Sequence, residues 1–164
     1  MKWFNNPKTL EELKKQYKKL ALRHHPDLGG NTADMQEINN EYDLLFERLK
    51  NVHRSADGNV YTARTATTET ASDYREIINR LINLKGIEIE ICGTWLWITG
   101  DTKPHREILK ELRFRWSNKK KAWYFHKDPY IKKSRRNLSL DDIRDLYGSE
   151  RIHQQETERE LITA

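Results

Sequence analysis

The side chains that could do chemistry are few and are spread along the sequence. Cys92 is the single cysteine, so it forms no internal disulfide, and its spacing to His24, His105, His126 and His153 matches no recognised zinc site. The sequence contains no P-loop, no GxGxxG and no GxSxG nucleophile motif. We therefore predict no catalytic residue, no metal site and no cofactor. A small hydrolase that uses His105 or His126 is the least favoured hypothesis.

The tripeptide His25-Pro26-Asp27 is expected to lie in a loop between two helices. Thr9 and Glu12 form a capping-box pattern that begins the first helix, and Pro26 ends it because proline has no amide hydrogen. Gly29-Gly30 predicts a turn before the second helix. Each helix has an apolar stripe at three- and four-residue spacing: Leu10, Leu13, Tyr17, Leu20, Ala21 and His24, then Met35, Ile38, Tyr42, Leu45, Leu49 and Val52. The two stripes and the short loop predict an antiparallel helical hairpin.

This hairpin resembles a J domain, the module of DnaJ-type co-chaperones, over residues 1 to about 50. The resemblance rests on the string from Leu13 to Asp27 and on Met35-x-x-Ile38-Asn39-x-x-Tyr42-x-x-Leu45. The first helix of the family is reduced here to Trp3-Phe4, whose rings are expected to cover the hairpin core. The Gly/Phe-rich segment and the zinc repeats of longer relatives are absent, so client binding of their type is not expected.

The resemblance implies docking on a DnaK-type chaperone and stimulation of that partner's ATP hydrolysis. It assigns the indispensable loop to His25, Pro26 and Asp27, and the chaperone-binding face of the helix before this loop to a set of basic residues: Lys14, Lys15, Lys18, Lys19 and Arg23. Helical periodicity independently places these lysines on one arc, with Leu22 as an exposed apolar residue, away from the apolar stripe. The alternative is that the lysines are only the solvated face of a helix.

The composition changes along the chain and divides it into units. Residues 54–70 have no periodicity and are rich in Thr, Ala, Ser and Gly, which is typical of a flexible linker. We therefore predict a J-domain hairpin over 1–53, a linker over 54–70, a connecting helix with a small α+β domain over 71–130, and a C-terminal helix and tail over 131–164. The fold class is multidomain, α and α+β.

The second unit has the predicted order ββαββ, preceded by a short helix over Tyr74–Leu81. Residues 87–91 alternate as a half-buried strand does, and Gly93-Thr94 predicts a two-residue turn into Trp95–Thr99. This turn pairs Cys92 with Trp95 and places Ile89, Ile91, Leu96 and Ile98 on one sheet face. A helix after Pro104 and strands over Phe114–Trp116 and Ala122–His126 complete a two-layer unit, and a last helix begins at Ser139. The unit loosely resembles small domains appended to J domains in phage and plasmid proteins.

The register places Trp95 and Trp97 on the opposite sheet face. Residues 86–137 hold thirteen lysines and arginines against six acidic residues, whereas residues 138–164 are acidic. Stacking on the two tryptophans, with phosphates neutralised by a basic set, would bind single-stranded nucleic acid: Arg113, Arg115, Lys119, Lys120 and Lys121. The alternative is that the Tyr74–Leu81 helix covers both rings as ordinary core.

The sequence favours a binding protein over an enzyme. It has 164 residues, 36% hydrophobic and 34% charged, and its first residues lack the apolar stretch of a secretory signal. We expect a cytoplasmic J-domain co-chaperone, with no membrane partner, that recruits a DnaK-type chaperone to a protein client or nucleic acid bound by the C-terminal unit. The alternative is a nucleic-acid-binding accessory protein of a mobile element in which the hairpin is only scaffold. The oligomeric state stays open.

Overall fold

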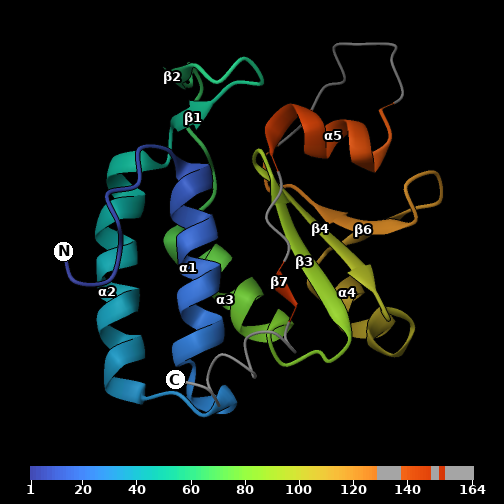
Figure 1. Ribbon diagram of the computed structural model, residues 1–164, viewed down its shortest axis with the longest axis horizontal. Coiled ribbons are helices and arrows are strands. Elements are labelled where there is room, and N and C mark those ends of the chain that lie inside the picture. The colour runs from blue at the N-terminus through green and yellow to red at the C-terminus, as the bar shows by residue number, and fades with distance from the viewer. Residues whose placement is uncertain (129–137, 149–151, 154–164) are drawn as a thin grey trace.

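The computed structural model describes residues 1–128, 138–148 and 152–153. In these residues the chain forms five α-helices and two small antiparallel sheets, a mixed α+β fold with its first two helices at the N-terminus. Figure 1 shows these two helices on one side of the molecule, the larger sheet on the other, and a third helix between them. None of the described helices is long and apolar enough to cross a membrane.

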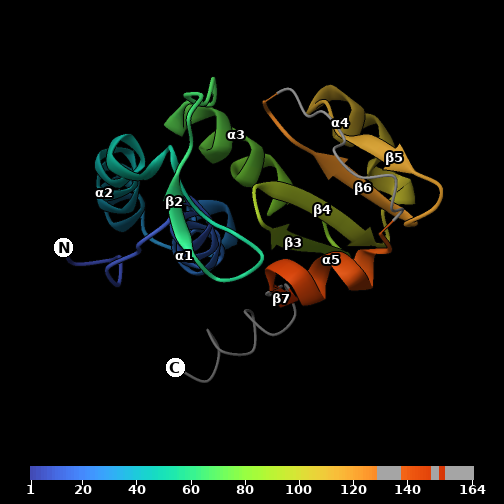
Figure 2. The ribbon, with the colours of Figure 1, turned by 90° about the horizontal axis from the view of Figure 1, so that it is seen from above.

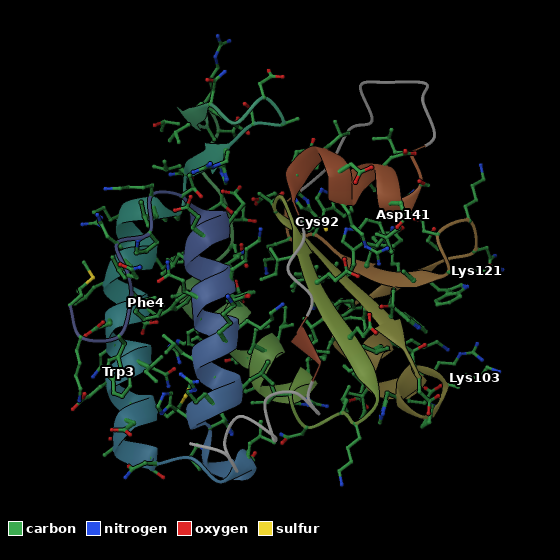
Figure 3. All side chains as sticks on the ribbon, in the orientation of Figure 1. Trp3, Phe4, Cys92, Lys103, Lys121 and Asp141 are labelled. Atoms are coloured by element: carbon green, nitrogen blue, oxygen red, sulfur yellow. The ribbon has the colours of Figure 1, made fainter. Side chains whose placement is uncertain are left out.

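The N-terminal helices are α1 (Leu10–His24) and α2 (Thr32–Leu49), joined by the short 3-10 helix η1 (Pro26–Leu28). The helix α1 begins where the sequence predicts, because Thr9 accepts a hydrogen bond from the Glu12 amide, and Asn31 caps α2. The helices run antiparallel in Figure 1, and their stripes meet in a core of aromatic rings. Phe4 is buried beside this core, as expected, and Figure 3 shows Trp3 and Phe4 lying over α2.

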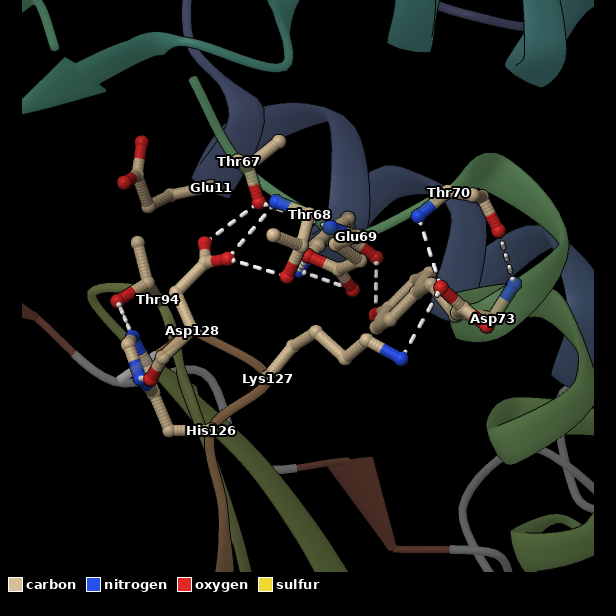
Figure 4. Close-up of polar contacts among 12 residues, drawn as sticks. Glu11, Thr67, Thr68, Glu69, Thr70, Asp73, Thr94, His126, Lys127 and Asp128 are labelled. Atoms are coloured by element: carbon tan, nitrogen blue, oxygen red, sulfur yellow. Dashed lines mark hydrogen bonds and ion pairs between the residues drawn. The ribbon is translucent and has the colours of Figure 1, made fainter. Parts of the chain in front are cut away.

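The segment predicted to be a flexible linker is ordered, so this prediction is wrong. It contains most of a hairpin of β1 (Val52–Arg54) and β2 (Val60–Thr62). Beyond the hairpin, Thr67 and Thr68 donate hydrogen bonds to the Asp128 carboxylate, which holds the segment against the end of the sheet (Figure 4). These two strands are short and largely exposed, so they lack the alternation that marks a half-buried strand.

The second unit contains α3 (Ala71–Leu81), β3 (Ile87–Cys92), β4 (Trp95–Gly100), the 3-10 helix η2 (Lys103–His105), α4 (Arg106–Glu111), β5 (Arg115–Ser117), β6 (Ala122–Phe125), α5 (Leu140–Tyr147) and β7 (Ile152–His153). The ββαββ order is present from β3 to β6. The strands lie in the order β5-β6-β4-β3-β7. The predicted register is confirmed, because Cys92 pairs with Trp95 and Ile89 with Ile98.

The sheet is covered on both faces, whereas the sequence predicted two layers. Figure 2 shows α3 and α4 on one side of the sheet and α5 on the other. The isoleucines of β3 join α3 and α4 in the main core, together with residues of α1 and α2. Leu140 of α5 covers a second, smaller core on the opposite face. The two predicted domains therefore share one hydrophobic core, with α5 as an added third layer.

Candidate functional site

The His25-Pro26-Asp27 turn is built by its own hydrogen bonds. His25 leaves the helical conformation, and its Nδ1 accepts a hydrogen bond of 3.2 Å from the Asp27 amide. The His25 carbonyl accepts from the amides of Leu28 and Gly30 at 3.0 and 2.9 Å. Gly30 must be glycine here, since a Cβ would lie 2.0 Å from the His24 carbonyl oxygen. The turn therefore holds its shape without contributing a buried side chain to the core.

The turn presents its aspartate outward and its histidine inward. The Asp27 side chain is 58% exposed and the His25 side chain 14%, with Nδ1 and Oδ2 3.6 Å apart. Asn83, just beyond α3, donates a hydrogen bond of 3.2 Å to Asp27 Oδ2. This bond ties the turn to the chain that leads into β3. The two N-terminal helices and the second unit therefore meet at the proposed functional turn.

The predicted basic face is wrong in part, because three of its six residues are buried. Lys14 is 4% exposed, and its Nζ lies 2.8 and 2.7 Å from the two carboxylate oxygens of Glu69. Lys18 is fully buried and donates 2.8 Å to the Ile89 carbonyl of β3. Leu22 is also buried. Periodicity groups these residues correctly on one arc, but α3 and β3 cover that arc, which a pattern within one helix does not reveal.

A narrower basic row stays accessible on α1. Lys19 and Arg23 are exposed and Lys15 is half-buried. Their spacing of four residues places them along one line of the helix surface, and Arg23 lies one turn before Pro26. We call Lys15, Lys19 and Arg23 the α1 row. The accessible part of the predicted chaperone-binding set is thus this row together with Pro26 and Asp27.

A cleft of about 1230 Å³ opens beside the turn, between α3 and the strands β5 and β6. Ion pairs join its walls near the two ends of α3, from Asp73 to Lys127 at 3.6 Å and from Arg80 to Glu111 at 3.1 Å. Acidic and basic side chains line the cleft together. The cleft therefore has no strong preference for a ligand of either charge.

The predicted tryptophan platform is wrong, and so is the predicted cover. Trp97 is 5% exposed and lies in the smaller core under α5, not under α3. Trp95 is half-buried and stacks on His126 with ring centroids 4.5 Å apart. The Lys120 ammonium lies 5.9 Å from the centre of the Trp97 ring. Neither tryptophan forms an open surface for bases. The helix α5 covers the sheet face that carries them, for which the sequence analysis predicted either no cover or cover by the Tyr74–Leu81 helix.

An ion pair holds α5 in this position. The Arg144 guanidinium donates to both carboxylate oxygens of Glu90, whose side chain on β3 is fully buried. These hydrogen bonds raise the pKa of Arg144, which stays charged throughout the range in which proteins fold. Because the two residues lie 54 positions apart, their pairing has no local sequence signal.

Trp116 of β5 is an aromatic residue that sequence reasoning did not assign to a site. It is 42% exposed, and the other four tryptophans are buried or half-buried. Arg113, Arg115, Lys119 and Lys121 around it are exposed, as the nucleic-acid hypothesis requires. The available signal was its position in the sequence, directly after Arg115 and three residues before Lys119, on the third strand of the unit.

Within the described residues, no group of three or more histidine, cysteine, aspartate or glutamate side chains is arranged to hold a metal ion. Cys92 is a buried cysteine that is in no disulfide. We compared the whole chain with known proteins. No protein-family model, curated protein or solved structure matches it. The functional argument therefore rests on the residues and their geometry.

Proposed function

We propose that this protein is a J-domain co-chaperone that docks on a DnaK-type chaperone and stimulates its ATP hydrolysis. The observation that carries the proposal is the exposed Pro26-Asp27 edge of the turn at the end of an antiparallel helical hairpin. Residues on exposed loops of a rigid scaffold are commonly the ones that bind. The turn combines the family's motif with a position in which Pro26 and Asp27 are exposed.

The docking surface in this proposal is the turn together with the α1 row. Lys19 and Arg23 provide positive charge on the last two turns of α1, the helix that leads into the turn with the exposed carboxylate of Asp27. The surface therefore fits a partner that has an acidic patch and a hydrogen-bond donor for this carboxylate. Lys14, Lys18 and Leu22 are excluded from it in this structure. The surface is therefore smaller and more polar than the sequence suggested, which favours a transient complex.

In this proposal the chain itself makes and breaks no bond. It acts in the cytoplasm on the ATPase of its partner, while the second unit holds the client. The buried contact of Lys18 with the Ile89 carbonyl joins α1, which leads into the turn, to β3 of the sheet. A client on the sheet side would therefore be presented to the chaperone in a defined orientation.

Steady-state ATP hydrolysis by a DnaK-type chaperone, with and without the purified full chain, tests this proposal. We expect wild type to raise the rate and His25→Gln to lose the stimulation, because the substitution alters the turn but not the apolar stripes. Circular dichroism of the variant should match wild type. Absence of stimulation by wild type, or full stimulation by a folded His25→Gln, would contradict the proposal.

A further inference from the structure

The stretch from Lys103 to Lys121 concentrates positive charge that is only partly neutralised within the described residues. Its two carboxylates are already paired, Glu107 with Lys110 and Glu111 with Arg80. Six of its basic side chains are exposed and have no ion pair or side-chain hydrogen bond in the part of the chain that the structure describes: Lys103, Arg106, Arg113, Arg115, Lys119 and Lys121. Figure 3 shows Lys103 and Lys121 pointing outward on the side away from α2.

Trp116 lies in the middle of this charge. It belongs to β5, which has β6 as its single strand neighbour among the described residues. Its ring packs against Trp123 with centroids 5.7 Å apart, and its indole N–H donates 2.7 Å to Asn118 Oδ1. The indole is thus held in place and its N–H is satisfied, while 42% of the residue stays exposed. A ring fixed in this way loses little side-chain entropy on binding.

We infer that this edge binds single-stranded nucleic acid, with Trp116 as the stacking residue and its basic neighbours as phosphate contacts. We call Arg113, Arg115, Trp116, Lys119 and Lys121 the β5 edge. Arg113 comes just before the strand and the two lysines follow it, so a nucleotide strand that crosses Trp116 along β5 has cations before and after it. Arg115 is adjacent to Trp116 in the strand and points to the other face of the sheet, so it contributes to the charge of the edge and does not flank the ring. Stacking requires a base that is not stacked in a duplex, which makes the ligand single-stranded.

Two competing roles fit the residues of the β5 edge less well. Charged residues on edge strands discourage pairing between molecules, but that role needs no exposed tryptophan. An added peptide strand would use the free backbone edge, yet it would leave the four cations of the β5 edge unneutralised unless the peptide were strongly acidic. Cations before and after an exposed aromatic ring, without ion pairs in the described structure, fit a polyanion that carries aromatic bases.

The backbone offers a test that removes charge without harming the fold. Arg113 and Lys121 have φ angles of 67° and 51°, the left-handed region that favours glycine. The double variant Arg113→Gly/Lys121→Gly therefore removes two cations at positions where glycine is the better residue for the backbone. Its thermal stability should be equal to wild type or higher. The matched control is Lys8→Gln/Arg64→Gln, two exposed cations away from β5.

The measurement is fluorescence anisotropy of a labelled oligothymidylate, about 12 nucleotides long, titrated with the full chain at several salt concentrations. We expect wild type to bind at low salt. Arg113→Gly/Lys121→Gly should reduce the slope of log K against log salt by about 1.4, at about 0.7 for each lost contact. The control should keep the wild-type slope. Trp116→Leu, which preserves the apolar contact with Trp123, should weaken binding by about 5- to 150-fold.

Three results would overturn the inference. They are no binding by wild type at low salt, unchanged affinity in Trp116→Leu, and equal losses in the glycine variant and its control. A poly-glutamate peptide serves as the competing ligand. If it displaces the oligonucleotide from wild type and from Trp116→Leu equally well, the edge is a general polyanion or peptide surface and the nucleic-acid assignment is wrong.

Discussion

In α1, Lys14 and Lys18 carry their ammonium groups into the interior, whereas the cations of the β5 edge point into solvent. The two segments look alike in the sequence, since both are short runs dense in lysine and arginine. In the fold, Lys14 meets Glu69 and Lys18 meets a carbonyl of β3, while Arg113, Arg115, Lys119 and Lys121 have no such partners in the described residues.

The difference shows that partners distant in sequence decide what a basic run does. A buried ammonium group must have compensating polar contacts, because desolvation of an unpaired charge is very costly. Such a lysine stabilises the fold, and its buried ammonium group is not accessible to a partner. An exposed cation without an ion pair contributes little to stability and stays available for an anionic ligand.

The largest expected effect is at Lys14. Lys14→Met leaves the Glu69 carboxylate buried without its cation, so we expect a loss of about 3–5 kcal/mol in the free energy of unfolding. Lys15, next to it, is half-buried and has no ion pair in the described part of the chain, so Lys15→Met should change stability by less than about 0.5 kcal/mol. Urea denaturation measures both, and equal stability of the two variants would contradict the structural role of Lys14.

A second variant sharpens this result. Lys14→Met/Glu69→Leu replaces the buried pair by apolar side chains, which commonly restores most of the stability. We expect the double variant to lie well above Lys14→Met in the same urea titration. If it is no more stable than the single variant, the cost at Lys14 comes from lost packing on Tyr74 rather than from an unpaired carboxylate.

The next largest effect concerns α5. Arg144→Met removes the guanidinium that binds the buried Glu90, and we expect a loss of about 2–3 kcal/mol. Because α5 covers the smaller core, Trp97 should become more accessible, and acrylamide should quench tryptophan fluorescence more strongly than in wild type. Asp145→Asn on the same helix is the control. Unchanged quenching in Arg144→Met would show that other contacts hold α5.

A smaller effect is expected at Asp128. Burial raises the pKa of this carboxyl, but hydrogen bonds from Thr67 and Thr68 outweigh it and hold the pKa below the usual 3.8. The stability that these bonds contribute is therefore present above about pH 4 and is lost as pH falls through the lowered pKa. Asp128→Asn should cost about 1 kcal/mol near pH 7. The difference from wild type should shrink below pH 4 in thermal melts, and a constant difference would contradict this assignment.

The smallest effect on stability is expected at the β5 edge. Lys119→Gln and Lys121→Gln should each change the free energy of unfolding by less than about 0.5 kcal/mol, since neither side chain has an ion pair in the described structure. Urea denaturation checks this. A loss as large as that of Lys14→Met would remove the contrast between the two segments.

Local sequence signals were enough for the hairpin and for the β3–β4 register. Thr9, Pro26 and the Gly93-Thr94 turn act over a few residues, so their effects follow from capping and turn chemistry. The positions of α5 and of the segment around Glu69 were not predictable in this way. They depend on contacts such as Arg144 to Glu90 and Lys14 to Glu69, which join residues more than fifty positions apart.

The candidate site likewise has features that neighbouring residues determine and features that distant residues determine. The turn at His25 is predictable because it is made by neighbouring residues, and it lies where the pattern placed it. The extent of the predicted chaperone-binding face was overestimated, since the sequence of α1 does not show that α3 and β3 cover half of that face. The aromatic surface was assigned to Trp97 rather than Trp116, because the cover over Trp97 comes from a helix more than forty residues later.

The central claim is that the exposed carboxylate of the turn activates a DnaK-type chaperone, and a matched pair of substitutions tests it most directly. Asp27→Asn removes one negative charge from the His25-Pro26-Asp27 turn. Asp57→Asn removes one negative charge from the β1–β2 turn, which lies at the opposite end of the helical hairpin. Both positions are exposed, so each variant should fold with stability within about 0.5 kcal/mol of wild type. In the steady-state ATPase assay we expect Asp57→Asn to stimulate the chaperone as wild type does and Asp27→Asn to give no stimulation. Equal stimulation by the two variants would contradict the account.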